Sequence, residues 1–191
     1  MLLIDGVNEV LQAIGESSVP NGVDIDSLDE FHEAKQIRTM IQKESKATQK
    51  KGWWFNKESW VFLPDATTGR IVVPVTVIAL VGTSATIAMR GNTMYDIANK
   101  TLLFDTDVTA MTTFELDFEE TPEVFAELVI LKTARKAQWL YKGDSAQDKK
   151  LEELVEEAKV DLEKEQFDNK SYNLIQGSRL IDRGSNPTAL I

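Results

Sequence analysis

The chain has 191 residues, of which 42% are hydrophobic, enough for the core of one large domain or of one domain with a smaller insert. Its formal net charge of −10 disfavours direct nucleic-acid binding, because a grip on phosphates requires clustered lysine and arginine. The absence of cysteine excludes disulfides, thiolate nucleophiles and sulfur-ligated metals. No secretory signal pattern is present, and no apolar run reaches the roughly 20 residues that span a membrane. We therefore expect no membrane segment and a chain that stays where it is made.

The first fifty residues carry helical patterns. Apolar residues recur at helical spacing between residues 2 and 14, and Gly15 follows as a terminator. Ser27 and Glu30 have the spacing of a capping box, in which each side chain satisfies a free amide at a helix start. The sequence therefore predicts a short first helix and a longer second helix that begins at Ser27 and ends at Gly52.

The pattern changes toward a period of two between residues 53 and 119. Residues 114–119 alternate apolar and acidic side chains, which is typical of a half-buried strand with one wet face. Further strands are predicted at 60–63, 71–73, 75–81, 86–89, 93–97 and 101–104, with turn-forming residues between them. This part is predicted to be a small β domain.

Helical signals return at Thr121 and Pro122, a cap residue followed by a favourable first helical residue. Apolar residues cover most of the circumference of this third helix in its first half, so we expect it to be the most enclosed. A fourth helix is predicted from Ser145, with a narrow apolar stripe and a strongly acidic outer face. Residues 171–191 lose periodicity but keep apolar residues, which predicts an extended C-terminal arm that binds a partner.

These elements together predict an α+β fold. The predicted architecture is a four-helix bundle with a small β domain inserted between helices two and three, plus an extended C-terminal arm. The expected boundaries are 1–52 and 120–170 for the two halves of the bundle, 53–119 for the β domain and 171–191 for the arm.

Catalytic and metal-binding patterns are missing from the sequence. No phosphate-binding loop, nucleophile elbow or zinc-binding histidine pair occurs, and the single histidine, His32, suits a helix surface better than a catalytic role. We expect no catalytic residue, no metal and no cofactor. Two alternatives stay open, a cellular protein-binding module and a polysaccharide hydrolase that uses paired carboxylates. The candidate residues of the hydrolase are Glu115, Asp117, Glu119 and Glu120, for which a solvated strand face followed by a helix-capping acid is the simpler interpretation.

Aromatic residues gather where the second helix gives way to the β domain. Trp53, Trp54 and Phe55 are adjacent, and only a few lysines surround them, so core packing plus a subunit interface is a better interpretation than stacking of bases or sugars. The residues predicted to contact another subunit or partner are Trp53, Trp54, Trp60, Tyr172, Leu174, Ile175, Leu180 and Ile181.

Several short motifs occur in a fixed order along the chain. They are VNEVLQAIGE at 7–16, KGWWFN at 51–56, LPD at 63–65, YD at 95–96, PEVF at 122–125, KTAR at 132–135 and YNL at 172–174. This series resembles the tail tubular protein A family of short-tailed bacteriophages, from about residue 5 to residue 177. No catalytic motif accompanies this family in general, although some relatives have been credited with polysaccharide-degrading activity.

The resemblance implies a structural virion protein, made in the host bacterial cytoplasm. Such a protein forms a dodecameric adaptor ring that docks on the portal protein and receives the tail nozzle (tubular protein B), with tail fibres near that junction. DNA passes through the channel without sequence-specific binding. We expect an acidic channel wall, because like charge keeps phosphates from sticking and screening limits repulsion to about 8 to 10 Å. The arm should become ordered only in the assembly.

Overall fold

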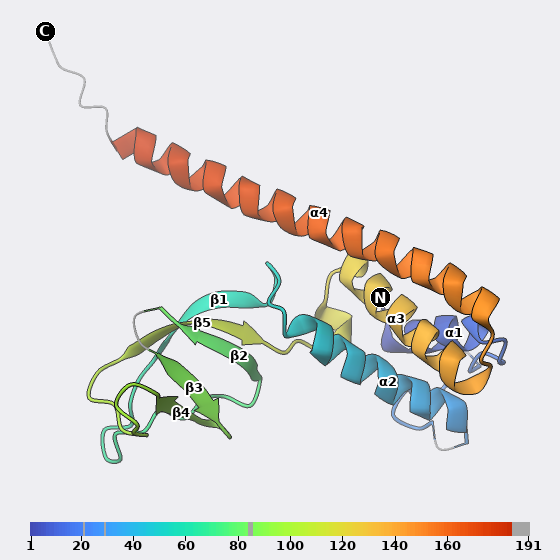
Figure 1. Ribbon diagram of the computed structural model, residues 1–191, viewed down its shortest axis with the longest axis horizontal. Coiled ribbons are helices and arrows are strands. Elements are labelled where there is room, and N and C mark those ends of the chain that lie inside the picture. The colour runs from blue at the N-terminus through green and yellow to red at the C-terminus, as the bar shows by residue number, and fades with distance from the viewer. Residues whose placement is uncertain (21, 29, 84–85, 185–191) are drawn as a thin grey trace, which may run out of the picture.

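The computed structural model describes residues 1–20, 22–28, 30–83 and 86–184, with side chains described as far as residue 169. Within these residues the fold is α+β, with four α-helices, one short 3-10 helix and two small sheets (Figure 1). The helices are α1 (Leu3–Ala13), α2 (His32–Gln49), α3 (Glu123–Tyr141), α4 (Ser145–Gly184) and the short 3-10 helix η1 (Phe118–Glu120). The strands are β1 (Lys57–Phe62), β2 (Val77–Gly82), β3 (Ile87–Arg90), β4 (Thr93–Asp96) and β5 (Val108–Phe114).

The helices enclose one hydrophobic core. Helices α1, α2 and α3 contact one another pairwise, and the first part of α4 packs on α3. Phe125, in the enclosed first half of α3, is fully buried, and the rings of Trp53 and Phe55 meet its ring edge to face. Helix α1 approaches α3 closely at Gly6, where a Cβ atom would lie 3.0 Å from Cδ1 of Ile130. The predicted enclosure of this part of α3 is confirmed.

The strands form a second, separate core. Strand β5 lies between β1 and β2 in an antiparallel sheet, while β3 and β4 form a hairpin. Ile71, Val73 and Met94 are almost completely buried between them. The predicted strands at 71–73 and 101–104 make only isolated bridges, because each segment meets a partner at single positions instead of along a ladder.

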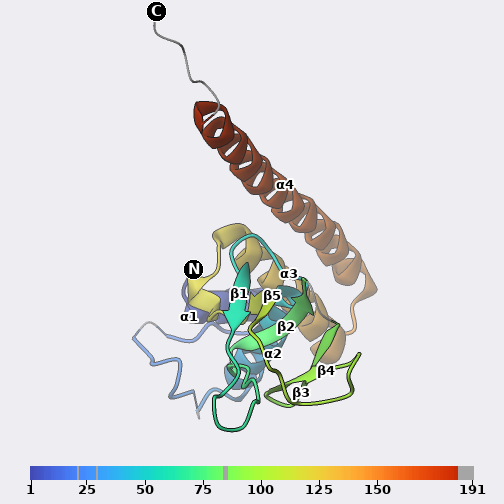
Figure 2. The same ribbon diagram turned by 90° about the vertical axis from the view of Figure 1, so that its left-hand side faces the viewer.

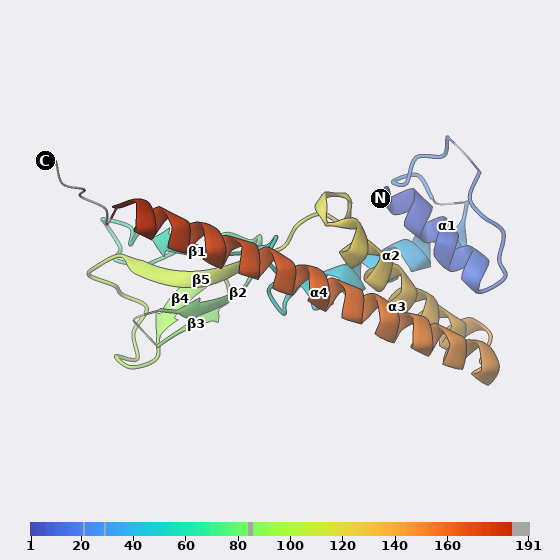
Figure 3. The same ribbon diagram turned by 90° about the horizontal axis from the view of Figure 1, so that it is seen from above.

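Helix α4 runs back along α3 and then continues beyond it (Figures 1 and 3). Its apolar stripe consists of Leu151, Val155, Ala158 and Leu162, which are buried against the other helices. The next position on that stripe is Gln166, so the apolar contact ends there. The C-terminal part of α4 accordingly projects out of the body of the molecule (Figure 2).

The starts of two helices differ from the prediction. Helix α2 begins after Phe31, which makes no side-chain capping bond, so the capping box at Ser27 is wrong. Leu28 is 1% exposed and packs in the helical core, a tertiary contact that the local capping pattern does not contain. Thr121 is not the N-cap of α3 either, because its hydroxyl donates a hydrogen bond of 2.7 Å to the carbonyl of Phe118.

The predicted strand at 114–119 is also wrong. Strand β5 ends at Phe114, and the chain then leaves the sheet for η1. The alternation has another cause: Phe118 enters the helical core, Glu115 pairs with Lys46, and Glu119 accepts a hydrogen bond of 3.0 Å from the first backbone N–H of α1. The true strand was missed because threonine and alanine occupy most of its buried positions.

The C-terminal segment differs in conformation from the expected extended arm. Helix α4 runs without interruption from Ser145 to Gly184, so residues 171–184 are helical. Residues 185–191 lie outside the described part of the chain.

Candidate functional site

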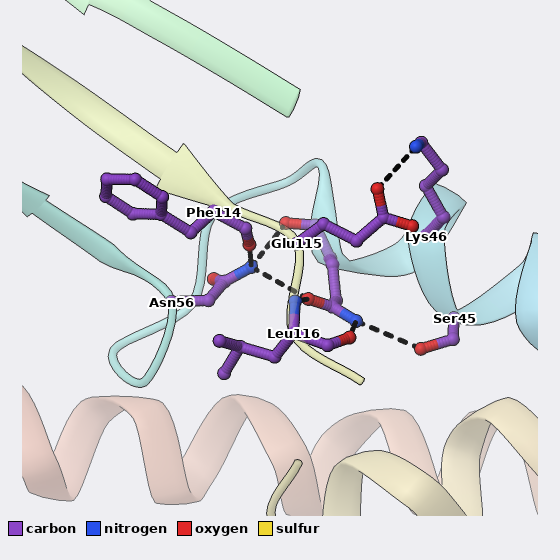
Figure 4. Close-up of polar contacts among 7 residues, drawn as sticks. Ser45, Lys46, Asn56, Phe114, Glu115 and Leu116 are labelled. Atoms are coloured by element: carbon purple, nitrogen blue, oxygen red, sulfur yellow. Dashed lines mark hydrogen bonds and ion pairs between the residues drawn. The ribbon is translucent and has the colours of Figure 1, made fainter. Parts of the chain in front are cut away.

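The chain crosses between helices and sheets twice, once after α2 and once after β5, and the two crossings lie side by side (Figure 4). Gln49, the last residue of α2, is fully buried at this point. Its Nε2 donates hydrogen bonds to the carbonyl of Leu116 (2.9 Å) and to the hydroxyl of Ser45 (3.0 Å). Its Oε1 accepts a hydrogen bond of 2.8 Å from the N–H of Leu116. The side-chain amide of Gln49 thus bonds to both backbone groups of Leu116, in the pattern by which the backbones of neighbouring strands pair.

Asn56 fastens the first crossing to the end of β5. Its Nδ2 donates to the carbonyl of Phe114 (2.9 Å) and to that of Gln49 (3.2 Å), while its Oδ1 accepts from the N–H of Trp53 (2.8 Å). The N–H of Phe114 in turn donates to the carbonyl of Asn56 (2.8 Å). Because buried polar groups are costly without partners, this closed set of bonds favours one arrangement of the two crossings. We call Gln49, Asn56, Phe114 and Leu116 the junction clamp.

Gly52 permits the turn that leads into the clamp. Its φ of +79° lies in the left-handed region, which glycine adopts without steric cost. A Cβ atom there would lie 2.8 Å from Cδ of Lys57 and 3.0 Å from Oγ1 of Thr113. The conformation therefore favours glycine at this position, and any larger residue would also need Lys57 and Thr113 to shift.

The structure places the three predicted interface tryptophans in different environments. Trp53 is 3% exposed, and its indole N–H donates to the carbonyl of Thr48 (2.9 Å), so its side chain belongs to the core of this chain. Trp54 is partly buried and meets the ring of Phe55 edge to face. Trp60, on the edge strand β1, is 43% exposed. The prediction of a subunit contact therefore stays with Trp60 and the exposed part of Trp54.

The remaining predicted contact residues lie in the distal part of α4. Their backbone is helical, and their side chains lie outside the described part of the structure. They are Tyr172, Leu174, Ile175, Leu180 and Ile181.

A groove that the sequence did not reveal runs along the outer side of α3, between α2 and α4. It is open, with a volume of about 640 Å³, and Met40, Trp139, Leu140 and Val155 supply its apolar lining. Trp139 is 74% exposed and Leu140 is 64% exposed, which is unusual for adjacent large apolar residues. The sequence does contain one sign of exposed apolar surface here, the run of Trp139, Leu140 and Tyr141 at the end of α3. Three consecutive large residues on a helix cannot all face one core.

The groove shows positive charge above a buried carboxylate. The side chain of Glu44 is 8% exposed, while those of Lys132 and Lys136, which both pair with it, are 31% and 62% exposed. Burial is the largest influence on Glu44 and raises its pKa. The hydrogen bonds and charges of Lys136 and Lys132 outweigh burial together, so the pKa of Glu44 lies below its ordinary value. Glu44 is therefore charged at neutral pH, and solvent meets mainly the two ammonium groups.

Helix α4 presents the opposite charge. Its side turned away from α3 carries exposed Glu153, Glu156, Glu157, Asp161 and Glu163, which confirms the predicted acidic face. A cationic side chain of α3, Arg135, contacts the first turns of α4. Arg135 forms hydrogen bonds of 2.9 and 3.3 Å with the two oxygens of Asp148 and one of 3.0 Å with Glu152. The hydrogen bond from Arg135 also lowers the pKa of Asp148.

Two of the four carboxylates considered for hydrolysis have structural partners, and the other two, Asp117 and Glu120, are exposed. Glu115 pairs with Lys46, and Glu119 holds the N-terminus of α1. Among the described residues, no three acidic or histidine side chains come together in a way that could hold a metal ion. None of the described helices combines the length and the apolar character needed to cross a membrane.

Comparison with known proteins assigns this chain to a class. A model of the tail tubular protein family matches residues 4–177. "Tail tubular protein A" of Klebsiella phage KP34 is 28% identical over 157 residues, which cover 81% of this chain and 80% of that protein. The class is therefore that of structural proteins of the bacteriophage tail. The chain belongs to the tail tubular protein family, as the order of its motifs indicated.

Proposed function

We propose that this protein is the tail adaptor, a ring subunit that joins the portal to the tail nozzle and forms part of the DNA ejection channel. The ring is a dodecamer that assembles on the portal protein and receives the nozzle protein beneath, with tail fibres near the junction. The protein is made in the host cytoplasm and acts in the virion tail, without cofactor or catalysis. The family match over residues 4–177 is the observation that carries this proposal.

The two cores support an adaptor with two contact surfaces. We propose that residues 1–52 and 120–170 form a four-helix bundle and residues 53–119 an inserted β domain, each with its own hydrophobic core. An adaptor must present different faces to two assemblies and keep them at a fixed angle. The junction clamp supplies that connection, because it ties both chain crossings together through buried hydrogen bonds.

The acidic character of α4 supports a role beside passing DNA. We propose that part of this negative charge faces the channel, where it repels phosphates over about one Debye length and prevents binding. We also propose that residues 171–191, which begin in the distal part of α4, contact the portal or a neighbouring adaptor.

Mixing with portal protein tests the proposal. The full chain is combined with purified portal, and the products are examined by native mass spectrometry and electron microscopy. We expect symmetric particles with one adaptor ring per portal, and no release of reducing sugar from capsular polysaccharide. A chain that stays monomeric beside intact portal, or that releases sugar, contradicts the proposal.

A further inference from the structure

We propose that the groove along α3 is the receiving half of a contact between adjacent copies of this chain, and that the outer side of α4 is the inserted half. The inference rests on the proposed function, since it assigns surfaces to the ring that the function requires. The evidence for the inference is the charge, the exposure and the position of residues on α3 and α4.

The receiving half combines apolar surface with positive charge. Trp139 and Leu140 offer two large, mostly exposed side chains at one end of the groove. Lys132 and Lys136 stand beside them, with their neutralising partner Glu44 buried beneath. A ligand for such a surface needs apolar side chains flanked by carboxylates.

The outer side of α4 has that composition. Val160 is 62% exposed and Phe167 is 69% exposed, and the interval of seven residues places both on the same side of the helix. Glu153 and Glu157 precede them on this side, at helical spacing, and the exposed Lys164 lies between the two apolar residues. No other described element covers this side of α4 (Figure 1). A helix whose apolar ridge is preceded by Glu153 and Glu157 fits a groove in which Lys132 and Lys136 stand beside apolar side chains.

One chain cannot make this contact with itself. Ala158 and Leu162 face the helical core, so Val160 between them points away from α3. The groove lies against the opposite side of α4, where Val155 forms part of its lining. The inserted half must therefore come from another molecule, and the chain carries both halves of the contact.

Two different surfaces of the same chain give a head-to-tail contact. Such a contact propagates from copy to copy and closes into a ring when the rotation per subunit allows it. Opposite charges at the contact also counter the general repulsion between copies that each carry a net charge of −10. The proposed pair of surfaces thus fixes the head-to-tail order of the subunits and provides electrostatic attraction between them.

Disulfide trapping tests the inference, because the chain contains no cysteine of its own. The double variant Trp139→Cys with Val160→Cys is assembled on portal and mildly oxidised. We expect a ladder of covalent multimers on a denaturing gel, whereas a mixture of the two single variants should stop at dimers and neither single variant should cross-link alone. The matched control is the double variant Leu63→Cys with Val160→Cys. Leu63 is also exposed, at 68%, but it lies just after β1.

Particle formation is recorded in parallel by electron microscopy. Rings that form without cross-linking above the Leu63→Cys control overturn the inference and leave the proposed adaptor function intact. If neither rings nor cross-links form, the adaptor function fails and the inference fails with it. Cross-linked multimers without portal-bound rings support the contact and contradict the adaptor role.

A charge exchange gives a second, non-covalent test. Glu157→Lys changes an exposed residue and should weaken self-assembly at least about tenfold in dissociation constant. Adding Lys136→Glu on the same chain should restore part of that loss, since the opposite charges then meet again across the contact. Equal dissociation constants for the wild type and Glu157→Lys overturn the inference.

Discussion

Gln49 and Leu116 lie 67 residues apart in the chain and exchange two hydrogen bonds, one of 2.9 Å from Nε2 to the carbonyl and one of 2.8 Å from the N–H to Oε1. The contact joins the last residue of α2 to the segment that leaves the sheet (Figure 4). A single buried side chain thereby links the helical core to the return path from the β core.

Gln49→Ala should destabilise the protein strongly. The change leaves the N–H and carbonyl of Leu116 without their partner and removes one acceptor of Asn56. We expect a loss of about 2 to 4 kcal/mol in the free energy of unfolding, measured by urea denaturation. Gln42→Ala, an exposed glutamine on the same helix, is the control and should change stability by less than about 0.5 kcal/mol. Equal effects of the two variants would show that the clamp contributes nothing.

Replacement of Gly52 by alanine separates backbone strain from steric crowding. Gly52 and Gly91 both have positive φ angles, +79° and +64°, but only at Gly52 would a Cβ atom meet other atoms within 4 Å. Gly91→Ala should cost about 1 kcal/mol through the unfavourable left-handed conformation. Gly52→Ala should cost about 2 to 3 kcal/mol, because Thr113 must also move. The comparison is made by thermal and urea unfolding; a Gly52→Ala variant as stable as Gly91→Ala contradicts the crowding argument.

The charge of Glu44 predicts how stability depends on pH. Its folded pKa lies below the ordinary value, because Lys136 and Lys132 outweigh the effect of burial. A lowered folded pKa stabilises the protein above the unfolded pKa of Glu, about 4.3, and this contribution is lost as pH falls through the folded value. Wild type should therefore lose its advantage over Glu44→Gln as pH decreases from 6 to about 3. The measurement is the free energy of unfolding of both proteins across this range, and a constant difference would show that Glu44 is not the titrating group.

The sequence predicted the helices better than the strands. The ends of the helices were visible because glycines with positive φ, namely Gly15, Gly52 and Gly143, follow the last helical residue within two or three positions. The start of α2 was not visible, since the capping pattern at Ser27 is local and the burial of Leu28 is a tertiary effect.

The middle of the chain shows why alternation alone misleads. Residues 114–119 alternate because Phe114 packs on the β core and Phe118 enters the helical core, while Glu115 and Glu119 make polar contacts. Only Phe114 belongs to a strand. Strand β5 shows no alternation of apolar and polar residues, because Thr112 and Thr113 are buried although they are polar. Its content of β-branched residues was the remaining signal.

The candidate contact surfaces were predicted only in part. Trp53 and Trp60 look equivalent in sequence, yet the turn at Gly52 directs Trp53 into the helical core and leaves Trp60 on the free edge of the sheet. The groove beside Trp139 depends on the spacing of three helices, which no local pattern contains.

The two tryptophans give the sharpest test of where the interface lies. Trp53→Ala should remove about 3 to 5 kcal/mol of stability, because it empties a buried site against Phe125 and frees the carbonyl of Thr48. Trp60→Ala should cost only about 1 kcal/mol in the isolated chain, where the ring contacts Phe114 and is 43% exposed. If Trp60 contacts a neighbour or partner, the same change should weaken assembly on portal, measured by the fraction of adaptor that co-sediments with it. A Trp60→Ala protein that assembles as wild type would move the interface away from β1, because the stability of the subunit itself is nearly unchanged.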